Sequence, residues 1–288
     1  MSIERKIETN IQLAVPIFFK DEVYVRAEIR KPTGKVIADT KKSSDTGDFF
    51  SSLRVFLVGC VESITKKDEQ VITDKVALKS LIPKMPYKTA EQLALAIVSL
   101  HNSDDDGVEG VYYCPACNTP VFAKKECSDG VDIDTRDFIS QLPIGYYEGT
   151  GIIEADLSEP VHIKNAVSGE ILEEITSFAI GFPTLEHGIN AFQKYGNSDT
   201  VRLQFSMFAQ ALVSVNGEPV DNRFKNAVGT LLFEGIKDVL EDLTKKIIRP
   251  INKCGVIPEI PKFCPNCGKE WKAQVNTSNF FASALRVS

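Results

Sequence analysis

The sequence has few residues suited to acid–base or phosphate chemistry. Only three of its 288 residues are histidines. His101, His162 and His187 have no serine, cysteine or carboxylate at the spacing of a catalytic motif, so each is better explained as a capping or surface residue. No glycine-rich phosphate loop stands between a strand-like and a helix-like segment. We therefore expect a protein that is not an enzyme, and we assign it no catalytic residue and no small-molecule substrate.

A clustered basic surface and a long apolar run are also lacking. The formal net charge is −6, and the densest basic stretch, residues 245–249, ends a predicted helix, where cations complement the helix dipole. This distribution argues against a nucleic-acid partner. No apolar run approaches the length of a membrane span, and the charged N-terminus has no apolar segment behind it. We expect a protein that has no membrane partner and stays in the cytosol.

Three short motifs occur twice, in the same order. The second occurrences follow the first by 144, 151 and 150 residues. The pairs are LAVPI (13–17) and LSEPV (157–161), IRKPT (29–33) and IGFPT (180–184), and CPAC (114–117) and CPNC (264–267). This repetition predicts an internal duplication, with a first lobe over residues 1–140 and a second over residues 141–288. Proline and glycine cluster at the expected junction, residues 141–151.

The first copy reads as strands followed by helices. Residues 11–19 and 23–29 predict two strands, because apolar residues alternate in the second of them. Asp48 is placed to cap a helix, and the apolar residues that follow lie on one helical face: Phe50, Leu53, Leu57, Cys60 and Ile64. Thr89 and Gln92 have the spacing of a capping box before a second amphipathic helix that runs to Leu100.

The second copy repeats this order and gives the class α+β. Residues 152–157 predict a strand, and residues 230–248 predict a helix that Pro250 ends. Its apolar stripe consists of Leu232, Ile236, Val239, Leu243 and Ile247. Residues 273–275 and Phe280–Phe281 predict a closing strand. We expect two similar α+β lobes joined by a zinc-ribbon-like site.

Four of the seven cysteines form two Cys-Pro-x-Cys knuckles, Cys114/Cys117 and Cys264/Cys267. Two-residue spacing lets both sulfurs of a knuckle reach one metal ion, and two knuckles complete a tetrahedron of thiolates around zinc. An aromatic, strand-like segment precedes each knuckle and another strand-like segment follows it. Because nothing indicates secretion, this pattern favours metal ligation over disulfides. We predict one structural Zn²⁺ held by all four thiolates.

Other interpretations of the cysteines remain open. A redox dithiol requires a reactive cysteine at a helix N-terminus, and neither pair precedes a helical pattern. Separate sites in each lobe would add Cys127 to the first knuckle and Cys254 to the second, and each would then lack a fourth ligand. A catalytic zinc requires an open coordination position, which four thiolates close. Cys60 lies on an apolar helix face and is explained as a core residue.

The first lobe resembles a known phage family in its opening residues. IQL (11–13), Pro16, Ile17, residues 23–30 and KPTG (31–34) are similar to the start of small tail-assembly proteins of Mu-like phages. Those proteins run from a β-hairpin into an Arg-x-Pro-Thr-Gly-like step.

The second lobe resembles baseplate hub assembly proteins of T-even-type contractile-tailed phages. The likeness rests on the strand 152–157, the helices after it, the knuckle Cys264/Cys267 and the closing NFF (279–281), so in all it covers about half of the chain. This sequence departs from that layout in having two knuckles and a repeated body.

The resemblance implies a non-enzymatic structural or assembly protein of a contractile tail or baseplate, in a phage or a phage-like injection system. Its partners would be other tail and baseplate proteins, and it would act in the host cytoplasm or remain in the virion. Candidate contact residues are Tyr146, Tyr147, Phe280 and Phe281.

Two other classes remain open. One is a zinc-ribbon nucleic-acid-binding accessory protein, which would use the basic residues near the knuckles: Lys124, Lys125, Lys262, Lys269 and Lys272. The other is a metal-dependent enzyme.

Overall fold

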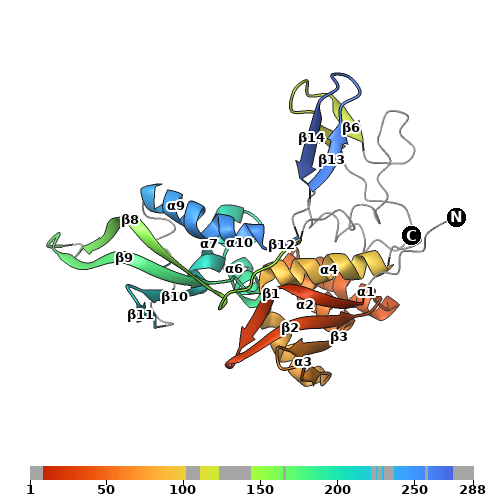
Figure 1. The fold of residues 1–288 in the computed structure, drawn as a ribbon, viewed down its shortest axis with the longest axis horizontal. Coiled ribbons are helices and arrows are strands. Elements are labelled where there is room, and N and C mark those ends of the chain that lie inside the picture. The colour runs from red at the N-terminus through yellow and green to blue at the C-terminus, as the bar shows by residue number, and fades with distance from the viewer. Residues whose placement is uncertain are drawn as a thin grey trace.

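The computed structural model describes residues 9–101, 111–122, 144–164, 167–221, 225, 229, 237–256 and 259–274. These residues form two bodies of helix and sheet and a pair of two-stranded hairpins that project from them (Figure 1). The chain combines helices with antiparallel sheets, so the predicted α+β class is confirmed.

The first body places four antiparallel strands in the order β1-β2-β3-β4. Its elements are β1 (Asn10–Phe19), β2 (Glu22–Ile29), α1 (Gly34–Ser44), α2 (Phe49–Cys60), β3 (Val61–Lys66), β4 (Val71–Ile72), α3 (Lys75–Leu81), the 3₁₀-helix η1 (Ile82–Lys84) and α4 (Tyr87–His101). The predicted strands 11–19 and 23–29 are confirmed. The turn between them has positive φ at Lys20 and Asp21, which suits a two-residue hairpin loop.

The second body repeats that order, with β8-β9-β10-β11 as its sheet. Its elements are β8 (Ile152–Lys164), β9 (Ile171–Gly181), α6 (Leu185–Tyr195), α7 (Thr200–Gln210), β10 (Leu212–Val215), β11 (Glu218–Pro219), α9 (Lys237–Leu243), the π-helix η2 (Thr244–Ile248) and α10 (Arg249–Lys253). β7 (Ile144–Gly145) and β12 (Gly255–Val256) form a short separate pair. The predicted strand 152–157 lies within β8.

The first strand of each body is irregular at the same place. Pairing with the neighbouring strand shifts register between Gln12 and Ile17 of β1, and between Asp156 and Val161 of β8. Both irregularities contain the repeated Leu-x-x-Pro motif. Proline has no N–H to donate to a sheet, so it is tolerated where the ladder is interrupted. The motif therefore marks a bulge in both bodies.

The helices that follow are capped at equivalent positions. Thr33 accepts from the first turn of α1 and Thr184 from that of α6, 151 residues later. Asp48 caps α2 as predicted, and Asp199 caps α7 at the same interval. Threonine and aspartate suit these positions because their side-chain oxygens accept from backbone N–H groups that the helix leaves unpaired.

The predicted capping box at Thr89 and Gln92 is wrong. α4 begins earlier, at Tyr87, and both side chains lie inside it, bonded to the bulge of β1. The Thr89 hydroxyl accepts from Val15 N (3.0 Å) and donates to Val15 O (2.7 Å). The Gln92 amide accepts from Ala14 N (2.8 Å) and donates to Gln12 O (2.9 Å). These bonds satisfy backbone groups that the bulge removes from the sheet.

Two further expectations about helices are wrong. Ile64 lies in β3, because α2 ends at Cys60 and a strand follows directly. Pro250 does not end its helix but lies in the first turn of α10, after the wide π-turn of η2. A wider turn accommodates a ring that would clash with the carbonyl four residues earlier in an α-helix. Leu243 and Ile247 are buried as predicted, whereas residues 230–236 lie outside the described residues.

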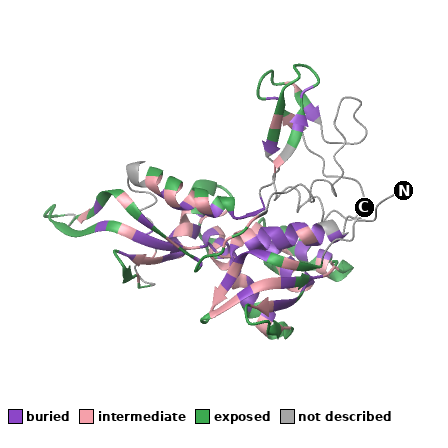
Figure 2. Cartoon of the chain, in the orientation of Figure 1, coloured by how far each residue is buried: buried purple, intermediate pink, exposed green. Residues whose placement is uncertain are grey.

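The described residues form two apolar cores, of which one is shared by the two bodies and the other lies mainly in the second body. Side chains of α6 and α7 are buried in the same cluster as those of α2 and α4, and Figure 2 shows the burial concentrated around α4. At Gly188 an added Cβ would lie 2.3 Å from the Phe50 ring, so only glycine permits this approach. Backbone bonds from Tyr87 N to Pro183 O (2.8 Å) and from Leu185 N to Met85 O (3.0 Å) fix the contact.

His187 is a capping residue, as predicted. Its Nδ1 accepts from Thr184 N (3.3 Å), and its own N–H donates to the Thr184 hydroxyl (3.3 Å), which makes a capping box. Burial lowers the pKa of His187 to about 4, with Lys225 and Lys84 acting in the same direction and Glu186 opposing them. The neutral imidazole that the cap requires is therefore the favoured form.

The bulge contacts predict that Thr89→Val destabilises the protein by about 2–3 kcal/mol, because it leaves the N–H and C=O of Val15 buried without partners. Urea denaturation would measure the loss. The exposed Thr73→Val is the matched control, with a change within about 0.5 kcal/mol. Equal stability of the two variants would show that the contact does not support the fold.

The cap of α6 predicts a specific loss of stability in acid. The pKa of His187 is near 6.5 in the unfolded chain and about 4 in the folded protein. The stability that the neutral imidazole contributes is therefore fully present above pH 6.5 and is lost as the pH falls toward 4. The full difference is about 3 kcal/mol. His187→Gln keeps an acceptor but cannot become charged, so its free energy of unfolding, measured by urea titration, should fall less over this range. Identical acid limbs in both proteins would contradict the assignment.

Candidate metal centre

The two knuckles are the turns of two similar hairpins. β5 (Val111–Tyr113) pairs with β6 (Pro120–Phe122), and β13 (Glu259–Phe263) pairs with β14 (Glu270–Gln274). The predicted succession of strand, knuckle and strand is therefore confirmed at both sites. The turns close in the same way, with Cys114 N donating to Thr119 O (3.0 Å) and Cys264 N donating to Lys269 O (2.9 Å). Gly268 takes the positive φ that its turn requires.

The structure brings the four predicted cysteines together. Their Sγ atoms all lie within 4.8 Å of one another, although the knuckles are 150 residues apart in the sequence. Cys114 Sγ lies 3.6 Å from Cys267 Sγ, and Cys117 Sγ lies 3.5 Å from Cys264 Sγ. Sulfurs that share a tetrahedral zinc at 2.3 Å are about 3.8 Å apart, whereas a disulfide requires about 2.05 Å. The cluster therefore has the dimensions of a metal site and could hold one metal ion.

The centre has a buried side and an exposed side. Cys114 and Cys264 are 1% and 0% exposed, whereas Cys117 and Cys267 reach solvent. A hydrogen bond from the Thr119 hydroxyl (3.1 Å) is the main cause that lowers the pKa of Cys117 to about 6. Metal ligation requires the thiolate, so this contact favours the binding form.

The hairpins are related by an approximate two-fold exchange. The contact between Cys114 and Cys267 becomes the contact between Cys264 and Cys117 when each residue is replaced by its counterpart 150 positions away. Each hairpin thus contributes one buried and one exposed cysteine. A site built from only one knuckle would have half of this ligand set.

Sequence reasoning missed one residue near the centre, Lys262. The sequence places it among the basic residues near the knuckles that would contact nucleic acid. Its side chain is instead buried, and its ammonium has no hydrogen-bond partner within the described part of the chain. The ammonium lies over the Tyr112 ring, 4.7 Å from its centroid. Burial lowers the pKa of Lys262 to about 8. The available signal was its position two residues before Cys264, which puts both side chains on one face of the strand.

Two other cysteines that the structure describes, Cys60 and Cys254, lie outside the four-cysteine cluster. Cys254 is buried at the end of α10, and its thiol donates to Pro250 O (3.4 Å). Cys60 is fully buried in the core that the two bodies share, and burial raises its pKa to about 12, so the prediction of a core residue is confirmed. Cys127 lies outside the described residues, as do Lys124 and Lys125.

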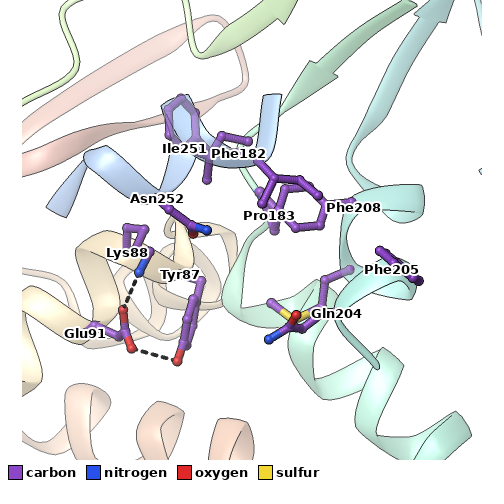
Figure 3. A pocket seen from close by; sticks show the side chains of 12 residues that line it. Tyr87, Lys88, Glu91, Phe182, Pro183, Gln204, Phe205, Phe208, Ile251 and Asn252 are labelled. Carbon is purple, nitrogen blue, oxygen red and sulfur yellow. Dashed lines mark hydrogen bonds and ion pairs between the residues drawn. The ribbon is translucent and has the colours of Figure 1, made fainter. Parts of the chain in front are cut away.

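A separate pocket of about 290 Å³ lies between the bodies. Figure 3 shows Lys88 and Glu91 paired at one wall (3.2 Å), with the Tyr87 hydroxyl also donating to Glu91 (2.8 Å). The other walls are mainly apolar and include Phe182 and Phe208. Lys88 and Glu91 pair with each other, and most of the remaining lining is apolar.

The remaining predicted histidine and aromatic residues lie away from the cysteines or outside the described residues. His162 is partly exposed in β8, with Nε2 3.2 Å from a Glu174 carboxylate oxygen. Tyr146 is exposed, whereas Tyr147 stacks edge-on against Phe182 with ring centroids 4.7 Å apart. The structure describes neither the side chain of His101 nor residues 280–281.

Comparisons with protein-family models, with curated proteins and with solved structures give no match to this chain. Among the described helices, none is both long and apolar enough to cross a membrane.

The geometry predicts one metal ion per chain. Cys264→Ser should abolish stoichiometric binding, since it removes a buried ligand, and elemental analysis after gel filtration would measure this. The matched control Cys254→Ala should keep the metal. If Cys254→Ala loses metal, or if two ions bind per chain, each lobe has its own site and the shared centre is wrong.

Proposed function

We propose that this chain is a non-enzymatic structural or assembly protein of a contractile phage tail or baseplate, or of a phage-like injection system. The observation that carries the proposal is that the first-lobe residues behind the resemblance, residues 11–34, form one continuous unit. A bulged hairpin, β1–β2, leads through the Lys-Pro-Thr step into α1, capped by Thr33. The same unit recurs as β8–β9 and α6.

We propose further that the two bodies arose by internal duplication. Support comes from backbone contacts that recur at a fixed interval of 151 residues. Arg30 N donates to Cys60 O (2.9 Å), and Gly181 N donates to Ala211 O (2.8 Å). Equivalent helices also support the two bulges. Asp242 of α9 accepts from Ser158 N in β8 (2.6 Å), and Gln92 of α4 accepts from Ala14 N in β1 (2.8 Å).

The proposed metal is a structural Zn²⁺. Four thiolates in a closed tetrahedral set suit zinc, which has no redox chemistry and no geometric preference of its own. The ion would hold the two hairpins together. Its ligands come from both lobes, so binding would fasten one half of the duplicated chain to the other.

The proposed partner surface is the end of the β8–β9 hairpin, which extends away from the second body (Figure 1). This hairpin is seven residues longer than β1–β2. The repeated motifs are 144 residues apart in its first strand and 151 residues apart at the end of its second strand. Val167 is 97% exposed, and Ile171 and Leu172 are more than half exposed. Glu170 and Glu173 lie beside them and are also exposed. Exposed apolar residues with an acidic rim are typical of a protein contact.

The proposal predicts that the tagged full-length chain, purified from producing cells, recovers tail or baseplate proteins identifiable by mass spectrometry. The double variant Ile171→Ser, Leu172→Ser should lose most of that recovery, because it removes apolar contact area. The matched control, Val71→Ser and Val76→Ser, changes exposed apolar residues of the first body and should retain it. Recovery of a polymerase or of salt-sensitive nucleic acid would instead favour the nucleic-acid-binding class.

A further inference from the structure

Lys262 occupies a position that is unfavourable for a lysine. It is 3% exposed, and its ammonium has no hydrogen-bond partner among the described residues. Burying an ammonium without a partner is costly, and a hairpin core of this size is more simply filled by an apolar side chain. Among the described residues, the Tyr112 ring is the one group seen to contact the ammonium, and a ring carries no net charge to balance it. Whatever offsets it must lie close to the hairpins.

The position of Lys262 relates it to the cysteines. Alternate residues of a strand point to the same side, so Lys262 lies on the face of β13 that continues into Cys264, and Tyr112 on the face of β5 that continues into Cys114. Pro261 and Phe263, on the opposite face, are exposed, which agrees with this alternation. Lys262 and Tyr112 are counterparts separated by 150 residues, and they meet between the two hairpins.

The chemistry of the centre supplies the missing charge. Four thiolates around a divalent ion leave a net charge of about −2. Half of the ligand set is buried, since Cys114 and Cys264 are almost inaccessible. A negative centre in a partly buried site is stabilised by a nearby cation, because charges interact more strongly away from water. Without that cation, the buried thiolates would be harder to assemble around the ion.

We infer that Lys262 is the counter-charge of the metal centre, held in place by the Tyr112 ring. This inference rests on the proposed metal site. Lys262 binds no metal itself; it acts on the thiolates through its fixed positive charge, and the ring face orients its ammonium. The duplicated position therefore carries a cation in one hairpin and an aromatic ring in the other. Groups that support metal ligands in this way commonly change metal affinity.

The test is a metal-affinity series on the full-length chain, with Co²⁺ and Zn²⁺ as probes and a competing chelator of known affinity. Lys262→Met keeps the length of the side chain and removes the charge, so Zn²⁺ should bind about 10- to 100-fold more weakly. Lys262→Arg keeps the charge and should restore most of the affinity. Lys269→Met removes an exposed charge from the same hairpin, and should change affinity by less than about threefold.

A second readout separates a counter-charge from packing. Without metal, Lys262→Met should unfold at the same or a higher temperature than the parent, because the variant no longer buries an ammonium that lacks a hydrogen-bond partner. The absorption bands of bound Co²⁺ should keep their tetrahedral thiolate form, so the loss would lie in affinity alone. Lys262→Gln gives a second uncharged variant should Lys262→Met not fold.

Each failure has its own signature. If Lys262→Met binds Zn²⁺ as tightly as Lys269→Met does, the counter-charge role is wrong and the metal centre stands. If Lys262→Met and Lys262→Arg weaken binding equally, side-chain shape matters and charge does not, which also overturns the inference. If the parent protein binds neither ion, the metal centre itself is wrong.

Discussion

The structure depends on one constraint: four thiolates from two distant parts of the chain must meet at a single point. Each hairpin has only two strands, and a two-stranded hairpin is marginally stable in water. Its buried interior is also small, with Val121 and Ala273 among its few apolar members. A shared metal ion would supply what such hairpins lack, because ligation converts binding free energy into folding free energy. On this proposal, zinc would be the means by which the projecting hairpins hold their shape.

Two different contacts join the halves of the chain. The bodies share a core in which α6 packs on α2 and α4, and Gly188 allows the Phe50 ring to approach its backbone. The hairpins instead meet through their cysteines, and the two contacts between them are equivalent under an approximate two-fold rotation. The first contact is apolar and needs no metal, whereas the second would depend on the proposed ion. Loss of metal should therefore loosen the hairpins before it loosens the bodies, and the shared core would still hold the proposed partner surface on β8–β9 in place.

Local patterns in the sequence predicted local structure well and failed where a distant partner decided the outcome. The cysteine spacing and the Asp48 cap could be read directly, since ligand geometry and capping each act over a few residues. Thr89 and Gln92 have capping-box spacing, yet their partners are backbone groups more than 70 residues away. The burial of Lys262 could not be read from charge, because it follows from the meeting of two hairpins.

The central claim is that both knuckles bind the same ion. The most direct measurement is X-ray absorption at the zinc edge on the native, gel-filtered protein, which counts and identifies the ligands without perturbing the chain. A shared centre predicts four sulfur ligands at about 2.3 Å and no nitrogen or oxygen ligand. A shell of two or three sulfurs completed by nitrogen or oxygen would show that the knuckles bind separately, and would contradict the shared centre.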